Sequence, residues 1–129
     1  MQERRRGFTE LSQRVLEGRA AMIDGDHAAA IAAFGRAAEI QGMGEEGGDP
    51  PVIWYPTRRS LAAAMLASGD AAGARAKVLE LLKDWPNDPY SHFVLAQAET
   101  ALGNPAAAAE AERRSRLEWV GGAMSLKLA

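Results

Sequence analysis

The chain has 129 residues, 47% hydrophobic and 25% charged, which is typical of one folded domain and excludes a disordered chain. A net charge of −2 gives no support to nucleic-acid binding, and the absence of cysteine excludes disulfides and thiolate metal sites. No apolar run approaches the roughly 20 residues of a membrane span, and no signal peptide follows Arg4, Arg5 and Arg6, so we expect a cytoplasmic protein that binds neither membrane nor nucleic acid.

The first third of the chain predicts two helices and a long loop. Residues 1–7 are polar and basic and are predicted to form a flexible tail. Apolar residues at helical spacing then predict helices over 8–24 and 27–40, with Gly25 and Asp26 as the stop of one and the cap of the next. Residues 42–53 hold four glycines and two prolines, so they are expected to form a loop inserted between helices.

The remaining residues predict four further helices and no strand. The expected ranges are 54–68, 71–84, 89–102 and 105–120, and residues 122–129 form a C-terminal tail. Gly69 with Asp70, and Gly103 with Asn104, repeat the stop and cap seen at Gly25 and Asp26. Proline at position 105 is suited to a first helical turn, where its missing N–H costs little.

Three small residues recur in each pair of helices at a regular spacing. The second and third sets lie 34 residues apart, and the first lies 44 residues before the second. The sets are Gly18, Gly25 and Ala30, then Ala62, Gly69 and Ala74, then Ala96, Gly103 and Ala108. A repeated helix pair with about ten extra residues after the first unit is the signature of a helical repeat array.

This pattern resembles the tetratricopeptide repeat (TPR), which places a small residue midway in its first helix, a glycine in the turn and an alanine early in its second helix. The resemblance implies an all-α fold, a right-handed α–α superhelix (alpha solenoid) of about three helix pairs within residues 8–121. The units would span 11–41, 55–88 and 89–120. Glu112, on the outer face of the last helix, is typical of a terminal repeat on which nothing stacks.

A second resemblance covers the stretch from Asp49 to Leu66, with Pro50-Pro51, Trp54-Tyr55-Pro56, Arg58 and Ser60-Leu61 as its residues. It is similar to a stretch of bacterial TPR proteins of unassigned function, whose repeats form the C-terminal part of longer chains. The resemblance implies a bacterial origin and leaves open whether this chain is a piece of a longer protein.

TPR arrays usually bind extended peptides along a concave surface lined by the first helix of each unit. By helical phase the candidate partner-binding residues on this surface are Arg19, Arg59, Tyr90, Phe93 and Gln97. We expect the two arginines to bind an acidic side chain or a C-terminal carboxylate, and the two aromatic rings to give an apolar platform. The alternative is that Arg59 is solvated and Phe93 belongs to the core. The same phase places further residues on this surface, namely Val15, Met22, Ala63, Leu66 and Thr100.

Trp54, Tyr55 and Arg58 form a second candidate binding group. Arg58 follows Trp54 by four residues, so its guanidinium is expected to stack on the indole ring. Such a group either clamps a ligand or pins the adjoining loop to the helix pair beneath it. We favour the pinning role.

Neither histidine has the spacing of a metal site, so His27 and His92 are expected at the surface, with no metal and no cofactor. The mixed charges from Glu110 to Glu118 are expected on a solvated helix face. With no catalytic constellation, the sequence predicts a non-catalytic protein-interaction module or scaffold. One alternative is homodimerisation through an uncovered apolar face of Phe8, Leu11 and Val15. Another is an accessory or substrate-binding domain of a larger enzyme or complex.

Overall fold

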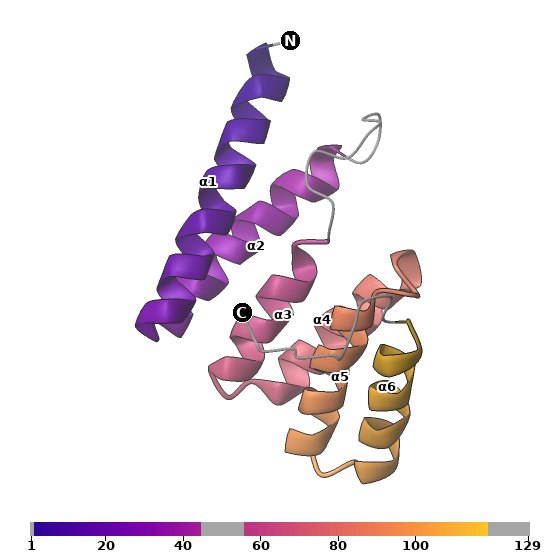
Figure 1. Ribbon diagram of the computed structural model, residues 1–129. Coiled ribbons are helices and arrows are strands. Elements are labelled where there is room, and N and C mark those ends of the chain that lie inside the picture. Colours follow the sequence, from indigo (N-terminus) through magenta and orange to yellow (C-terminus); the bar gives the residue numbers. More distant parts are fainter. Residues whose placement is uncertain (1, 45–55, 119–129) are drawn as a thin grey trace.

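The structure, a computed structural model, describes residues 2–44 and 56–118 and contains six helices there (Figure 1). They are α1 (Gln2–Asp24), α2 (His27–Gly44), α3 (Arg58–Ala67), α4 (Ala71–Asp84), α5 (Pro89–Ala101) and α6 (Pro105–Glu118). No strand occurs within these two ranges. The predicted all-α class is therefore confirmed for the described residues.

Three helix bounds differ from the expected ones by several residues, while α3 and α5 each end one residue earlier than expected. The first helix begins at Gln2 rather than Phe8, because the glutamine, glutamate and arginines of this stretch favour helix without any apolar spacing. The predicted tail is therefore helical from Gln2 to Gly7. Helix α2 continues to Gly44, into the predicted loop, and α3 begins only at Arg58. The rest of the predicted 42–53 insertion, together with Trp54 and Tyr55, lies outside the described residues.

The three tight turns between paired helices share one geometry. Gly25, Gly69 and Gly103 have positive φ angles of 75°, 98° and 77°. The residue after each glycine donates its N–H to the carbonyl oxygen five residues back, each time over 2.9 Å. This arrangement satisfies the open carbonyls at a helix end and requires a residue that tolerates positive φ. The predicted recurrence of the helix stop is thus confirmed at the level of individual hydrogen bonds. Two of the predicted caps are confirmed as well, since the carboxylates of Asp26 and Asp70 each accept the backbone N–H three residues further on.

Small residues allow the two helices of a pair to approach closely. Gly18 of α1 faces the ring of Phe34 on α2, and a Cβ atom on Gly18 would lie 2.5 Å from the Phe34 Cε1 atom. The other five predicted contact positions are all buried, at Ala30, Ala62, Ala74, Ala96 and Ala108. The predicted close contact is therefore confirmed at Gly18, and the burial of the five alanines is what this role requires.

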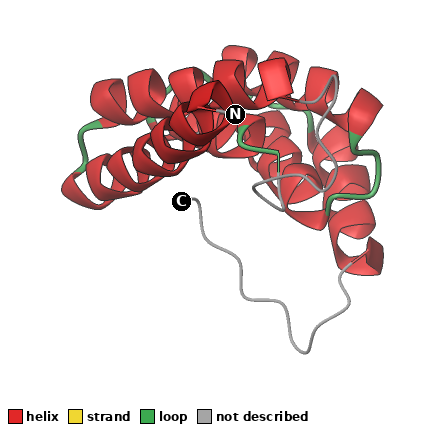
Figure 2. Cartoon of the chain, turned by 90° about the horizontal axis from the view of Figure 1, so that it is seen from above, coloured by secondary structure: helices red, strands yellow, loops and turns green. Residues whose placement is uncertain are grey.

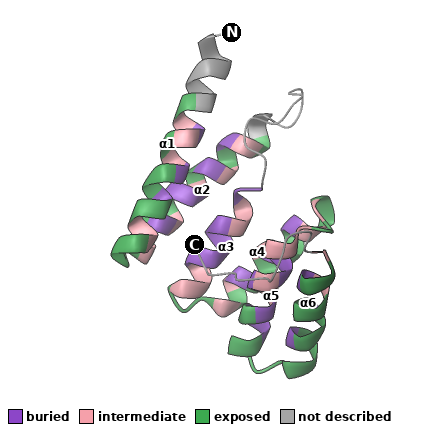
Figure 3. Ribbon diagram, viewed as in Figure 1, coloured by how far each residue is buried: buried purple, intermediate pink, exposed green. Residues whose placement is uncertain are grey.

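Each helix packs against the next along the chain, and α3 also packs against α5. The helices together form a curved array (Figure 2), with most of α6 exposed at its C-terminal end (Figure 3). The exposed side chain of Glu112 agrees with the terminal position expected for α6. Within residues 2–44 and 56–118, none of the helices combines the length and the apolar character needed to cross a bilayer.

The apolar face expected to be uncovered on α1 is covered. Leu11 and Val15 are buried and form a cluster with Ala37 and Ile40 of α2. The predicted dimerisation face of Phe8, Leu11 and Val15 is therefore wrong for Leu11 and Val15, because the partner of α1 is its own hairpin neighbour. The side chain of Phe8 lies outside the described residues.

Candidate partner-binding site

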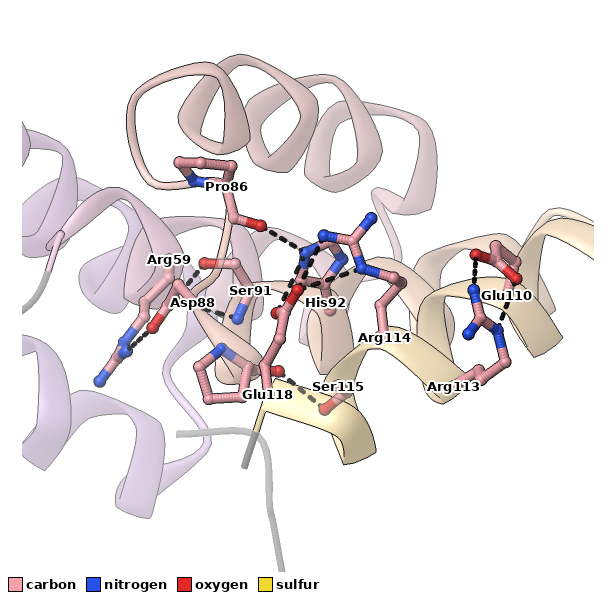
Figure 4. A network of polar contacts seen from close by, with 11 residues as sticks. Arg59, Pro86, Asp88, Ser91, His92, Glu110, Arg113, Arg114, Ser115 and Glu118 are labelled. Atoms are coloured by element: carbon pink, nitrogen blue, oxygen red, sulfur yellow. Dashed lines mark hydrogen bonds and ion pairs between the residues drawn. The ribbon is translucent and has the colours of Figure 1, made fainter. Parts of the chain in front are cut away.

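Arg59, in the first turn of α3, contacts the start of α5 in two ways. Its Nη1 atom donates to Oδ1 of Asp88 over 2.6 Å (Figure 4). Its guanidinium carbon also lies 5.0 Å from the ring centre of Tyr90, a distance at which a cation is attracted by the aromatic face. The Arg59 side chain is 23% exposed. Arg59 is thus not simply solvated, and it links two helices while keeping part of its surface open.

Asp88 is the centre of this group because it also caps α5. One carboxylate oxygen accepts from the Ser91 backbone N–H over 3.1 Å and from the Ser91 hydroxyl, while the other accepts from Arg59. The sequence favours this geometry, since aspartate is a strong cap and Pro89 fits the first helical turn. The carboxylate is 11% exposed. Any carboxylate that approaches Arg59 from outside must therefore share the guanidinium with Asp88.

Tyr90 and Phe93 lie side by side next to this ion pair. Their ring centres are 5.8 Å apart and their planes are inclined by 49°. Both rings are partly buried and pack against a cluster that contains Ala62 and Val94. Each ring therefore contacts the core on one side and is accessible on the other. The core reading of Phe93 holds in part, and its binding role stays a prediction. Gln97, one turn further along α5, is exposed.

The structure therefore brings together four of the predicted residues, namely Arg59, Tyr90, Phe93 and Gln97, on α3 and α5. Arg19 is exposed on α1, in a different helix pair. Two residues expected on the surface are buried, since Val15 packs on α2 and Ala63 lies in the cluster that joins α3 to α5. Helical phase does not identify Ala63 as buried, because its cluster is completed by Val78 of α4 and Val94 of α5.

Arg58 has an internal role. Its Nη2 atom lies 2.9 Å from Oδ2 of Asp84 and its Nη1 atom 3.7 Å from Oε1 of Glu80, both on α4. These contacts join the two helices of the second pair. The predicted stacking of Arg58 on Trp54, and the roles of Trp54 and Tyr55, lie outside the described residues.

His92 is buried, and the expectation of a surface position for it is wrong. Its Nε2 atom lies 2.9 Å from the carbonyl oxygen of Pro86 and 3.4 Å from Oε2 of Glu118 (Figure 4). Glu118 is held in turn by Arg114 over 2.8 Å, so this end of the α6 charge run is not solvated as expected. Spacing provides the missed signal, because His92 lies four residues before the buried Ala96 and so shares its helix face.

Glu99 shares this buried face as well, three residues after Ala96. Its side chain is 5% exposed and pairs with Arg75 of α4, which is 44% exposed. A buried carboxylate requires such a partner. Two ion pairs, Arg59 with Asp88 and Arg75 with Glu99, thus fix α5 to the two helices of the preceding pair.

The site offers one arginine, one amide and two aromatic rings, a set suited to binding a peptide. No group of three or more histidine, aspartate or glutamate side chains among the described residues is placed to hold a metal ion. Comparison of the chain with models of protein families, with curated proteins and with solved structures found no match.

Proposed function

We propose that this chain is a non-catalytic protein-interaction module of the TPR type, whose three helix pairs stack in a right-handed superhelix and bind a partner segment. The identical geometry of the three turns and the buried small residues support the repeat. The observation that carries the binding role is the cluster of Arg59, Tyr90, Phe93 and Gln97 on α3 and α5. This cluster combines a cation with apolar surface at one place.

The chemistry of the cluster favours an acidic partner segment with an apolar residue beside its carboxylate. The Arg59 side chain is 23% exposed, so a second carboxylate can approach its guanidinium from outside while Nη1 is bonded to Asp88. Tyr90 and Phe93 supply the adjoining apolar surface, and the Gln97 amide can donate to or accept from a peptide backbone. Because Asp88 repels a second carboxylate, we expect weak and reversible binding.

The test uses short synthetic peptides that carry one glutamate or a free C-terminal carboxylate next to a leucine. Amide shifts of the isotope-labelled protein, followed by NMR, are expected to map to α3 and α5. Arg59→Gln should weaken binding by about tenfold to a hundredfold, the value of a charge-assisted hydrogen bond. Arg113→Gln is the matched control, since Arg113 lies exposed on α6 and pairs only locally with Glu110.

The result that would overturn this proposal is equal binding by the wild type and the Arg59→Gln variant, or shifts confined to helices other than α3 and α5. Far-UV circular dichroism and unfolding of both variants separate a lost contact from a lost fold. Peptides with glutamine in place of the glutamate provide the complementary control on the ligand.

Homodimerisation is a second candidate, which a specific observation favours. Leu16 and Ile23 are 68% and 86% exposed, and their spacing of seven residues places them on one face of α1. Light scattering over a concentration series measures the mass, and a dimer that Leu16→Asp abolishes would support this candidate. A monomer at every concentration would remove it.

A further inference from the structure

The contacts between successive helix pairs are of two kinds. Between the second and third pairs, Arg59 of α3 binds Asp88 and Arg75 of α4 binds Glu99, with both carboxylates nearly buried. Helix α3 also packs directly against α5, and α4 against α5. Both helices of the second pair are thus fixed to α5 by directional bonds, and α6 is tied to α5 by the Ser115 hydroxyl, which donates to the Pro89 carbonyl oxygen over 2.8 Å.

The joint between the first and second pairs is different. Helix α2 packs against α3, whereas α1 and α3 share at most a slight contact among the described residues. Among the described residues, this joint contains an apolar cluster of Ala30, Phe34, Leu61 and Ala64, with Met22 and Met65 at its edge. Apolar contact is not directional, so it resists separation of the two pairs more than it resists their rotation.

A polar contact between two described residues also crosses this joint. Gln41 lies in the last turn of α2, which is one turn longer than α4. Its side-chain oxygen accepts from the Thr57 backbone N–H over 2.8 Å and from the Thr57 hydroxyl over 3.0 Å. Thr57 is fully buried at the start of α3, and its own hydroxyl makes no cap bond within that helix. Gln41 therefore caps α3 from the neighbouring helix pair.

We propose that α1 and α2 turn as one unit about the contact between Gln41 and Thr57, relative to a rigid block of α3, α4, α5 and α6. This motion changes the distance between α1 and the block and leaves the cluster of Arg59, Tyr90 and Phe93 intact. Figure 1 shows the pair α1 and α2 at one end of the array and α5 and α6 at the other, so rotation at this joint moves one end as a whole. The inference does not depend on which partner binds.

The experiment is double electron–electron resonance on spin-labelled cysteines, for which the absence of native cysteine makes the chain well suited. Ala109→Cys on α6 is combined with Ala20→Cys on α1 for the distance across the joint, and with Ala76→Cys on α4 for the distance within the block. All three alanines are exposed. We expect a wider distance distribution across the joint than within the block.

Gln41→Ala tests the assignment of the axis. It should widen or shift the distribution across the joint and leave the distribution within the block unchanged, which also shows that the variant is folded. Equal widths for the two wild-type label pairs would overturn the rigid-block inference. A distribution across the joint that Gln41→Ala does not change would overturn the role of Gln41.

Discussion

Gly18 provides a sharp test of how the first helix pair is packed. A Cβ atom at this position would lie 2.5 to 2.7 Å from three ring atoms of Phe34, closer than any ordinary contact between carbon atoms. The Phe34 side chain is fully buried, so the ring has no open space into which to move. Gly18→Ala must therefore force the two helices apart or strain the ring.

The expected magnitude follows from two opposing effects. Alanine is the better helix former by about 1 kcal/mol, whereas overpacking of a core costs about 1–3 kcal/mol. Because the contact involves a fully buried ring, we expect the upper part of that range and a net loss of about 1–2 kcal/mol. Gly35→Ala is the matched control, since Gly35 lies within α2 and a Cβ atom there would meet nothing within 4 Å. It should stabilise the protein by about 0.5–1 kcal/mol.

The assay is urea unfolding of the wild type and both variants, followed by circular dichroism. The opposite signs of the two changes are the signature of close packing at Gly18. A neutral or stabilising Gly18→Ala would refute the packing argument, since the chain would then accommodate a methyl group where the structure has no room. Phe34→Leu in the Gly18→Ala background should recover part of the loss, because the two side chains are in direct contact.

Two further predictions concern ion pairs. Arg75→Ala should lower the free energy of unfolding by about 2–4 kcal/mol, because it leaves the buried Glu99 carboxylate unpaired. Glu99→Gln should lower it by only about 1–2 kcal/mol, because it leaves a half-exposed cation. Urea unfolding measures both changes, and the reverse order would contradict this reasoning. The hydrogen bond from Arg36 lowers the pKa of Glu10 in the folded protein. This ion pair therefore stabilises the fold at a pH above the ordinary pKa of glutamate, and the stabilisation is lost as the pH falls through the lowered pKa of Glu10. Arg36→Gln should raise that pKa in an NMR titration and leave the pKa of Glu110, which Arg113 lowers, unchanged.

Most of the fold could be predicted because local signals and tertiary contacts agree. The turns at Gly25, Gly69 and Gly103 depend on a conformation that glycine adopts freely, so their positions are visible in the sequence. The start of α3 is different. Its cap comes from Gln41, across the predicted insertion, and no local pattern identifies a partner at that separation.

The candidate site could be predicted only in part, for a related reason. Helical phase identified Arg59, Tyr90 and Phe93, because all three face the side shared by α3 and α5. It placed Ala63 on the same surface, since the sequence does not show how closely α5 covers α3. The helical spacing from the buried Ala96 predicts that Glu99 is buried too. Its ion pair with Arg75 could not be predicted in this way, because that contact depends on the packing of α4 against α5.

Arg59 is both a structural and a candidate binding residue, and Asp88→Asn separates these roles. An asparagine keeps an oxygen for the Ser91 N–H, so the α5 cap is largely retained, while the negative charge beside Arg59 is removed. If Arg59 binds a partner carboxylate, this change removes a competitor and should strengthen binding of the glutamate peptide about threefold to tenfold, the value of about 1 kcal/mol for a partly exposed charge contact. If Arg59 only fixes α5 to α3, Asp88→Asn and Arg59→Gln should both weaken binding, because both loosen the face on which the peptide lies. Titration of the same peptide into the two variants therefore decides between these roles by the sign of one change.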